Sequence, residues 1–360
     1  ASSRSAAAAP LPQARQPRPQ RQGADHIVSA ALLWHNTIDS SAPMQSTNKN
    51  VKVFAANSHP GLAEEIAMLL NLPLGKRTLK KFSCGEIYVN FDESIRGHEI
   101  FLVATCRPNH VHEDFFELFL MCDAARRSFA RNIHVIIPHF GYARQDKLHA
   151  ARESISMKLC ADLLVKSGID HLITLNLHAD QSQAFFDVPV DNVSARKLLL
   201  EHFLKQDLTD TIVVSPDVGG AKTAKKFADS LGVDLAILHK NRPKHNEVEM
   251  SHVIGEVEGK RAILVDDMID TAGSVCNAKE ILVSHGASDQ VSLCATHPIF
   301  SGPAIERLEQ AGFAEIVVTN SIPIPDDKLL KNLTQISIAP LIANVILNVV
   351  REKSVSELFY

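Results

Sequence analysis

Three features that would assign this chain of 360 residues to common classes of protein are missing. No apolar run approaches the roughly 20 residues that a membrane span needs, and the most apolar stretch, residues 336–350, is interrupted by Pro340 and Asn344. The six cysteines include no Cys-x-x-Cys pair and no His/Cys cluster at zinc spacing. An excess of basic residues is also missing, because the net charge is −4 and the pI is near 6.5. These absences argue against a membrane protein, a metal or disulfide scaffold and a nucleic-acid binder.

The remaining composition is that of a globular protein with a large core. Hydrophobic residues make up 45% of the chain and charged residues 22%, and the length suffices for two domains of ordinary size. We expect the scattered cysteines to be reduced thiols, which favours a cytoplasmic location.

The first 43 residues differ in kind from the rest. They are rich in Ala, Ser, Gln, Pro and Arg, and Asp25 and Asp39 are their only acidic residues. We expect this segment to be disordered. Its composition is typical of an organelle transit peptide, but it contains the only Trp, and Met44 directly precedes the first ordered-looking segment. A transit peptide and a translated leader both remain open, and an organelle is therefore the alternative location.

Short β-branched and apolar runs recur from Val51 onward, with helical patterns between them. They span residues 51–57, 99–106, 133–141, 171–178, 211–217, 261–267, 290–297 and 315–323. Because these runs are apolar throughout rather than alternating, they predict strands covered by helices on both faces, and hence an α/β fold with parallel sheets. The rhythm predicts two tandem units, residues 51–190 and 191–325. A terminal helix at about 338–352 is expected to pack back on the first unit.

Polar residues directly follow several of these predicted strands. They include the segments 176–178 and 215–217 and the pair Asp266 and Asp267. In open α/β sheets, ligands bind beyond the carboxyl ends of the strands. The sequence therefore predicts a binding site at these strand ends.

The strongest single signal is AILVDDMIDTAGS, residues 262–274. A buried strand is expected to lead into the turn Asp270-Thr271-Ala272-Gly273-Ser274, with a helix beginning near Val275. Backbone N–H groups at a helix N-terminus, together with the two hydroxyls of this turn, can hold a phosphate monoester. Asp266 and Asp267 suit ribose hydroxyls, directly or through a divalent cation. The alternative is an ordinary strand-to-helix turn whose Asp and Ser serve as caps.

This turn resembles the phosphoribosyl pyrophosphate-binding loop of type I phosphoribosyltransferases and of ribose-phosphate pyrophosphokinases. The resemblance to the pyrophosphokinases extends from about Val51 to the C-terminus. Its other motifs, in the order of that family, are KFSCGEIYVNFDESIRG (81–97), FGYARQD (140–146), NLHADQ (176–181), FFDVPVDN (185–192), VSPDVGGAK (214–222), HKNRP (239–243) and ATHPIFSG (295–302). The resemblance implies two tandem phosphoribosyltransferase-type (type I) domains.

The resemblance also implies an ATP site. Arg144, Gln145 and His178 would hold the ATP phosphates and their Mg²⁺, and Arg supplies a planar fork for phosphate oxygens. Phe82 and Glu86 match residues that bind adenine from a neighbouring subunit. We therefore expect a homo-oligomer, with a hexamer as its expected form.

Ribose 5-phosphate would bind to Asp217, to Asp266 and Asp267, and to the turn Asp270-Thr271-Ala272-Gly273-Ser274. Asp217 matches a residue that contacts this sugar or a second metal ion, so the implied metal ligands are His178 and Asp217.

Lys240 and Arg242 match the Lys-x-Arg pair of the family's flexible catalytic loop. Attack on the β-phosphorus of ATP spreads negative charge over the transferring group and the leaving AMP, and positioned cations can stabilise that charge. Taken alone, the polar stretch NRPKHNEVEM (241–250) is more typical of a solvated loop, and its place in the order of the family's motifs favours the catalytic loop.

The chain departs from the family pattern at three places. Cys84 stands where Asp or Asn is usual, residues 148–154 replace the usual Lys, Asp and Pro, and Asn320 stands where Asp is frequent. Adenine recognition at Cys84, the ATP contacts of segment 148–154, and activation by phosphate or inhibition by ADP are therefore open.

The sequence thus predicts a ribose-phosphate pyrophosphokinase with ATP and ribose 5-phosphate as substrates and Mg²⁺ as cofactor. A catalytically silent regulatory homologue is the alternative, which the intact Lys240/Arg242 pair and the intact 266–274 segment disfavour. A nucleobase phosphoribosyltransferase is a third hypothesis, which the tandem domains and the ATP-site motifs disfavour.

Overall fold

The computed structural model describes residues 50–240 and 251–358. The predicted leader, residues 1–43, and Arg242 lie outside these ranges. For Lys240 the structure describes the backbone, which ends strand β9 (Asp234–Lys240). None of the helices in the described ranges is long and apolar enough to cross a membrane.

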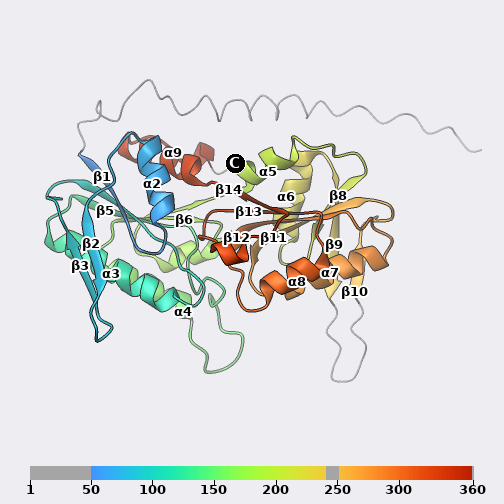
Figure 1. Cartoon of the computed structure of the whole chain (residues 1–360), viewed down its shortest axis with the longest axis horizontal. Coiled ribbons are helices and arrows are strands. Elements are labelled where there is room, and N and C mark those ends of the chain that lie inside the picture. The colour runs from blue at the N-terminus through green and yellow to red at the C-terminus, as the bar shows by residue number, and fades with distance from the viewer. Residues whose placement is uncertain (1–49, 241–250, 359–360) are drawn as a thin grey trace, which may run out of the picture. The chain divides into compact units, whose positions relative to one another are not determined.

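The first sheet contains five parallel strands in the order β1-β4-β5-β6-β7. These are β1 (Val51–Ala55), β4 (Glu99–Val103), β5 (Asn132–Ile137), β6 (His171–Leu175) and β7 (Val190–Val193). Its covering helices are α2 (Pro60–Leu69) and α9 (Ala339–Val350) on one face, and α3 (Val111–Arg127) and α4 (Ser156–Ser167) on the other (Figure 1). Every residue of β4 and β6 is buried, as expected for strands covered on both faces.

The second sheet contains seven strands in the order β10-β9-β8-β11-β12-β13-β14. Besides β9 these are β8 (Thr211–Ser215), β10 (Ser251–Ile254), β11 (Arg261–Ile269), β12 (Val291–Pro298), β13 (Glu315–Thr319) and β14 (Leu333–Ile336). The edge strand β10 is antiparallel to β9, and all other pairs are parallel. This sheet continues past residue 325, because β14 pairs with β13.

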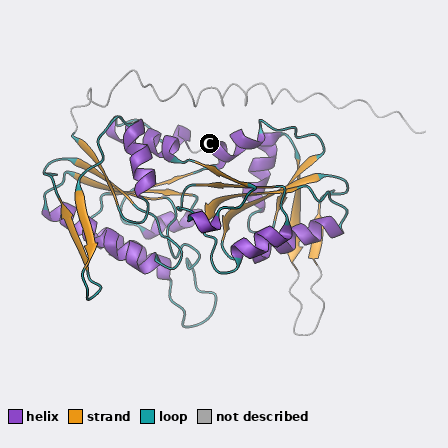
Figure 2. Ribbon diagram, in the orientation of Figure 1, coloured by secondary structure: helices purple, strands orange, loops and turns teal. Residues whose placement is uncertain are grey.

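Helices flank the second sheet on both faces (Figure 2). They are α5 (Arg196–Phe203), α6 (Ala221–Leu231), α7 (Gly273–Ser284) and α8 (Ala304–Ala311); short 3-10 turns occupy Asp180–Phe185, Asp326–Lys328 and Ser356–Leu358. All eight predicted apolar runs contain a strand, and the predicted α/β fold with parallel sheets is confirmed.

A separate antiparallel hairpin joins β2 (Arg77–Lys81) to β3 (Ile87–Phe91). The apolar-run criterion did not find it, because β2 is mostly polar and both strands are only partly buried. The hairpin packs on α3 through β3. Its turn carries residues 82–86 and thus the exposed ring of Phe82.

Hydrogen bonds join the carboxyl ends of strands from the two sheets. Thr105, just after β4, donates through Oγ1 to the carbonyl oxygen of Ser321, just after β13, at 2.7 Å. His297 of β12 bonds through Nε2 to the carbonyl oxygen of Leu175 of β6 at 3.0 Å. Helix α9 packs on α2. Because the strand ends of both sheets meet here, polar residues at these ends come together.

Candidate functional site: a polar cavity at the strand ends

Two adjoining cavities open at the carboxyl end of β11. Their volumes are about 430 Å³ and about 270 Å³. The residues common to both are His178, Gly219, Thr223, Val265, Asp266 and Asp267. We refer to the pair as the strand-end cavity; its smaller part adds Asp217 and Gly220, and its larger part adds Lys147, Arg196 and Lys222 among others. The structure therefore brings His178, Asp217, Asp266 and Asp267 together from three different strand ends.

His178 and Asp267 form a close pair across the two sheets. Nδ1 of His178 lies 2.6 Å from Oδ2 of Asp267. This hydrogen bond raises the pKa of His178 above its usual value. Burial acts to raise the pKa of Asp267, but the hydrogen bond and the charge of His178 outweigh it, so the pKa of Asp267 is lowered. Asp267 thereby orients the imidazole ring and leaves its Nε2 for a ligand.

The pKa of Asp266 is shifted in the opposite direction from that of Asp267. Burial, and then the neighbouring carboxylate of Asp267, raise its pKa well above the usual value. Asp217 is held by its own turn, since the N–H of Gly220 donates to Oδ1 at 2.8 Å. Among the described residues, neither Asp266 nor Asp217 has an ion-pair partner. The cavity thus places three carboxyl groups, Asp217, Asp266 and Asp267, beside one histidine.

This donor set fits Mg²⁺ better than a transition metal. Mg²⁺ prefers oxygen ligands and is usually held by one or two carboxylates, several waters and the phosphates of a substrate. In the part of the chain that the structure describes, no group of three or more His, Cys, Asp or Glu side chains is arranged to hold a metal ion by itself. A metal ion at this cavity would therefore need further ligands from a substrate or from water.

The turn of residues 270–274 leads directly from β11 into α7. The helix begins at Gly273, two residues before the predicted start near Val275, because Ala272 adopts a left-handed conformation (φ 60°) and acts as the N-cap residue. Thr271 and Ser274 are exposed. The first N–H groups of α7 have no partners within the helix, so this turn presents donors that suit an anion.

Asp270 at the start of this turn is held from two sides. Its carboxylate accepts hydrogen bonds from the hydroxyl of Ser301 and, at 2.5 Å, from Nη2 of Arg144. Burial acts to raise the pKa of Asp270, but these two contacts outweigh it, so its pKa is lowered. The sequence analysis included Ser301 only as part of a motif; its contact with Asp270 could not be predicted from a separation of 31 residues.

Arg144 and Gln145 line a third cavity of about 330 Å³ next to the turn of Asp270. Its other walls come from residues 108–112, residues 139–143, Met268 and Ile299. Gln145 is fixed by the hydroxyl of Ser156, which donates to its Oε1 at 2.6 Å. Two predicted ATP ligands are thus close to the predicted sugar site.

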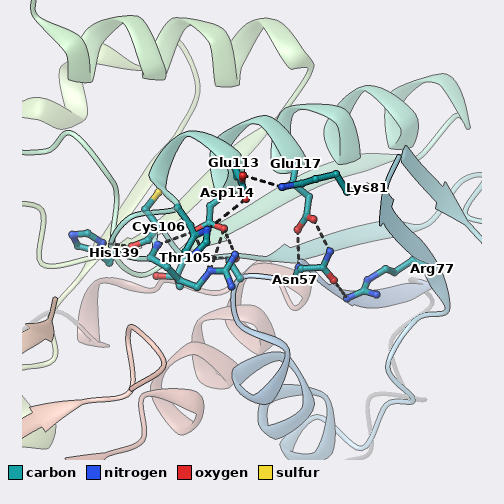
Figure 3. Close-up of polar contacts among 12 residues, drawn as sticks. Asn57, Arg77, Lys81, Thr105, Cys106, Glu113, Asp114, Glu117 and His139 are labelled. Carbon is teal, nitrogen blue, oxygen red and sulfur yellow. Dashed lines mark hydrogen bonds and ion pairs between the residues drawn. The ribbon is translucent and has the colours of Figure 1, made fainter. Parts of the chain in front are cut away.

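His139 is a further residue of this cavity that the sequence analysis did not identify. Its Nδ1 lies 2.7 Å from the carbonyl oxygen of Cys106 and must carry the proton, since a carbonyl only accepts (Figure 3). Burial lowers the pKa of His139, so the ring is neutral near pH 7. Its Nε2 is then a hydrogen-bond acceptor beside Arg144.

Polar contacts at the ends of β1 and β4 support the wall of this cavity (Figure 3). Arg107 donates through Nη2 to the buried carboxylate of Asp114 at 2.6 Å. Buried Glu117 accepts from both the backbone N–H and the side-chain amide of Asn57, each at 2.7 Å. These bonds fix the segment from Arg107 into α3, and therefore the side of the cavity that faces Arg144.

The structure does not bring Phe82 and Glu86 to these cavities. They lie at the turn of the β2–β3 hairpin, where the N–H of Phe82 donates to the carbonyl oxygen of Glu86 at 2.8 Å. The ring of Phe82 is 46% exposed and packs edge-on against Tyr88. Cys84 between them is an exposed thiol.

The divergent segment 148–154 is exposed and internally braced. One oxygen of Glu153 accepts hydrogen bonds from the backbone N–H groups of His149 and Ala150 at 2.7 and 2.9 Å. Asn320 likewise accepts from the N–H of Ile338 at 2.8 Å and donates its amide toward Ser337 at 3.3 Å. An amide can do both at once, whereas an aspartate at this position would only accept.

The fold is that of an α/β protein whose two largely parallel sheets bring polar strand ends together around one cavity, which is the usual place of a ligand site in such sheets. Residues 51–168 match the family described as the N-terminal domain of ribose phosphate pyrophosphokinase, and residues 244–360 match the phosphoribosyl synthetase-associated domain. Ribose-phosphate pyrophosphokinase of Oceanobacillus iheyensis is 46% identical over 313 residues, which cover 87% of this chain and 98% of that protein. The Bacillus subtilis protein of the same name is 45% identical over 316 residues, covering 88% and 99%.

A solved structure agrees with these sequence comparisons. Phosphoribosylpyrophosphate synthetase from Mycobacterium smegmatis superimposes with a TM-score of 0.79 at 44% identity, over 84% of this chain and 100% of that chain. The chain belongs to the ribose-phosphate pyrophosphokinase family.

Proposed function

We propose that this chain is an active ribose-phosphate pyrophosphokinase that binds Mg·ATP and ribose 5-phosphate in and beside the strand-end cavity. The C1 hydroxyl oxygen of the sugar attacks the β-phosphorus of ATP. The bond from that phosphorus to the oxygen bridging to the α-phosphate breaks, and AMP leaves with the bridging oxygen. The hydroxyl proton passes to solvent, and phosphoribosyl pyrophosphate is the second product.

Ribose 5-phosphate docks with its phosphate at the N-terminus of α7 and its hydroxyls toward the carboxylates of β11. Thr271 and Ser274 donate hydroxyl hydrogens to the phosphate oxygens, and the N–H groups at Ala272 and Gly273 complete the cradle. Asp270 accepts from a ribose hydroxyl. This placement is supported by the continuity of the turn with Asp266 and Asp267 along a single strand.

Arg144 and Gln145 hold the ATP phosphates, and Lys240 with Arg242 stabilises the negative charge that develops on the transferring group. Mg²⁺, bound through His178, Asp217 and the ATP phosphates, would supply positive charge to the β- and γ-phosphoryl oxygens. His178 is oriented for this by Asp267, and the position of Asp217 in the same cavity supports the assignment.

Phe82 and Glu86 of one subunit bind the adenine of an ATP molecule whose phosphates lie in the site of a neighbouring subunit. The assembly is a homo-oligomer, which we propose to be a hexamer. Two observations support this assignment. Within one chain these residues do not line the cavities that contain Arg144 and His178. Phe82 is also nearly half exposed, and aromatic residues are enriched at protein interfaces.

The observation that carries the proposal is the convergence of His178, Asp217, Asp266 and Asp267 in one cavity beside the 270–274 turn. The test is formation of AMP and phosphoribosyl pyrophosphate from purified protein, Mg·ATP and ribose 5-phosphate, with and without added phosphate. Equimolar products would support the enzyme. No AMP in either condition, from protein that is folded by circular dichroism, would overturn the proposal and favour a silent regulatory homologue.

A further inference from the structure

Arg307 is an exposed arginine of α8 that lies beside the 270–274 turn. Its Nη1 donates a hydrogen bond to the carbonyl oxygen of Thr271 at 3.0 Å. The same residue bonds to α7, since Sγ of Cys276 lies 3.6 Å from the carbonyl oxygen of Arg307. These two contacts hold Arg307 against the 270–274 turn, which follows β11.

The guanidinium of Arg307 lies next to Gly273, the first residue of α7. A Cβ atom built there would lie 3.2 Å from Nη1 and 4.0 Å from Cζ of Arg307. Since Cα–Cβ bonds in a helix tilt toward its N-terminus, the guanidinium lies beside the N-terminal end of α7. That is the end where the unpaired N–H groups of the turn are located.

The charge around the turn favours a cation beside a bound phosphate. Asp266, Asp267 and Asp270 all lie on the strand end that leads into it. Arg144, the other guanidinium nearby, is paired with Asp270. A phosphate monoester carries close to two negative charges at pH 7, and the ionised carboxylates of Asp267 and Asp270 nearby would repel it.

Arg307 can supply that cation because most of its donors are uncommitted. An arginine has five N–H donors, and the structure gives one of them to Thr271. Among the described residues, no carboxylate lies within the 4.0 Å of an ion pair with Arg307, whereas Arg107, Arg127 and Arg144 each have one. Its contact with Thr271 also restricts the side chain in advance, which reduces the entropy lost when a ligand binds.

We propose that Arg307 binds the 5-phosphate of ribose 5-phosphate and determines the preference for a phosphorylated over an unphosphorylated sugar. This inference rests on the proposed function. Nη1 keeps the turn in place through Thr271, while the remaining N–H groups donate to phosphate oxygens alongside the N–H groups of α7. Arg307 does not touch the reacting atoms and is a specificity residue.

The test compares Arg307→Gln with the unchanged protein on ribose 5-phosphate and on ribose, measuring AMP release at saturating Mg·ATP. We expect kcat/KM for ribose 5-phosphate to fall about 10- to 100-fold, the usual effect of losing a charged hydrogen bond. The kcat/KM for ribose and the KM for ATP should each change less than about threefold. An equal fall for both sugars would mean that Arg307 only supports the turn, and no fall would mean that it does not contact the phosphate; either result overturns the inference.

Three further variants separate phosphate binding from a structural role. Arg307→Lys keeps the charge but not the fork, so it should recover part of the loss. Gly273→Ala leaves every charge in place but puts a Cβ against Nη1, and should shift the KM for ribose 5-phosphate in the same direction. Arg127→Gln removes an exposed guanidinium of α3, 77% exposed and paired with Asp123, and should change neither sugar.

Failure of this inference and failure of the proposed function give different results. If the unchanged protein releases no AMP with ribose 5-phosphate, the proposed function is wrong. The other case is an active unchanged protein and an Arg307→Gln variant that urea unfolding shows to be equally stable. If this variant keeps its preference for the phosphorylated sugar, only the role of Arg307 is wrong.

Discussion

Nη2 of Arg144 lies 2.5 Å from Oδ2 of Asp270, which joins a predicted ATP ligand to a predicted ribose ligand across the two sheets. Each side chain is thus held by the other in the absence of substrates. Under the proposed function, phosphates that engage Arg144 would release Asp270 toward a sugar hydroxyl. The pair would then couple the two substrate sites through one ionic contact.

Asp270→Asn tests the assignment of the sugar site. The variant keeps the size of the side chain and removes its charge, so it should weaken binding of a ribose hydroxyl while leaving Arg144 free for ATP. We expect the KM for ribose 5-phosphate to rise about 10-fold or more, with the KM for ATP unchanged or lower. Steady-state kinetics with each substrate varied in turn measures both. A rise confined to ATP would show that the sugar site is wrongly placed.

Lys240→Ala tests the proposed role of the cation at the end of β9. If Lys240 contacts the transition state, turnover should fall by at least about 100-fold, the scale seen when one preorganised stabilising contact is removed. The unfolding midpoint in urea and the affinity for ATP should stay near those of the unchanged protein. Rapid-quench measurement of AMP formation, with calorimetry of ATP binding, provides the comparison. Retained turnover would remove Lys240 from the catalytic residues.

Phe82→Ala and Lys240→Ala together test whether neighbouring subunits share a site. Each variant alone should be nearly inactive, because one lacks the adenine contact and the other the catalytic cation. In a mixed oligomer some sites combine an intact Phe82 from one subunit with an intact Lys240 from another. Activity should therefore reappear after the two proteins are unfolded together and refolded.

The control for this experiment is each variant refolded alone, with the mass of all samples measured by light scattering. Mixed samples that are oligomeric but no more active than the separate variants would show that Phe82 acts within its own chain. A monomer with full activity would contradict the shared site altogether.

His297→Gln tests how a buried histidine at the joint between the sheets affects stability. Burial lowers the pKa of His297 to about 3, whereas in the unfolded chain a histidine has a pKa near 6.5. Between these values the unfolded state binds more protons than the folded state, so the free energy of unfolding must decrease as the pH falls below about 6.5.

The variant lacks this titration, so its stability should depend less on pH. From pH 7 to pH 5.5, we expect the unfolding free energy of the unchanged protein to fall about 1 kcal/mol more than that of the variant. Urea unfolding at a series of pH values measures the two slopes. His139, whose pKa burial also lowers, is present in both proteins and cancels from the comparison. Equal slopes would contradict a neutral His297 in the fold.

The sequence by itself determined the class of fold and the family. Apolar runs without alternation require strands buried on both faces, and all eight such runs contain strands of two largely parallel sheets. The hairpin β2–β3 and strand β10 did not follow from this pattern, because their residues are partly exposed at edges and make no continuous apolar run. The 270–274 turn was predictable because it lies between one strand and one helix that are adjacent in the sequence.

Only the tertiary structure decided which residues meet. Arg144 reaches Asp270 over 126 positions, and His178 reaches Asp267 over 89; no local pattern encodes such distances. Strand ends and helices from separate segments converge, and this brings Ser301, His139 and Arg307 to the cavities and the turn. In the sequence, each of these residues looks like an ordinary polar residue. Local chemistry can be read from spacing along the chain, whereas pairing across the sheets depends on how the buried faces pack.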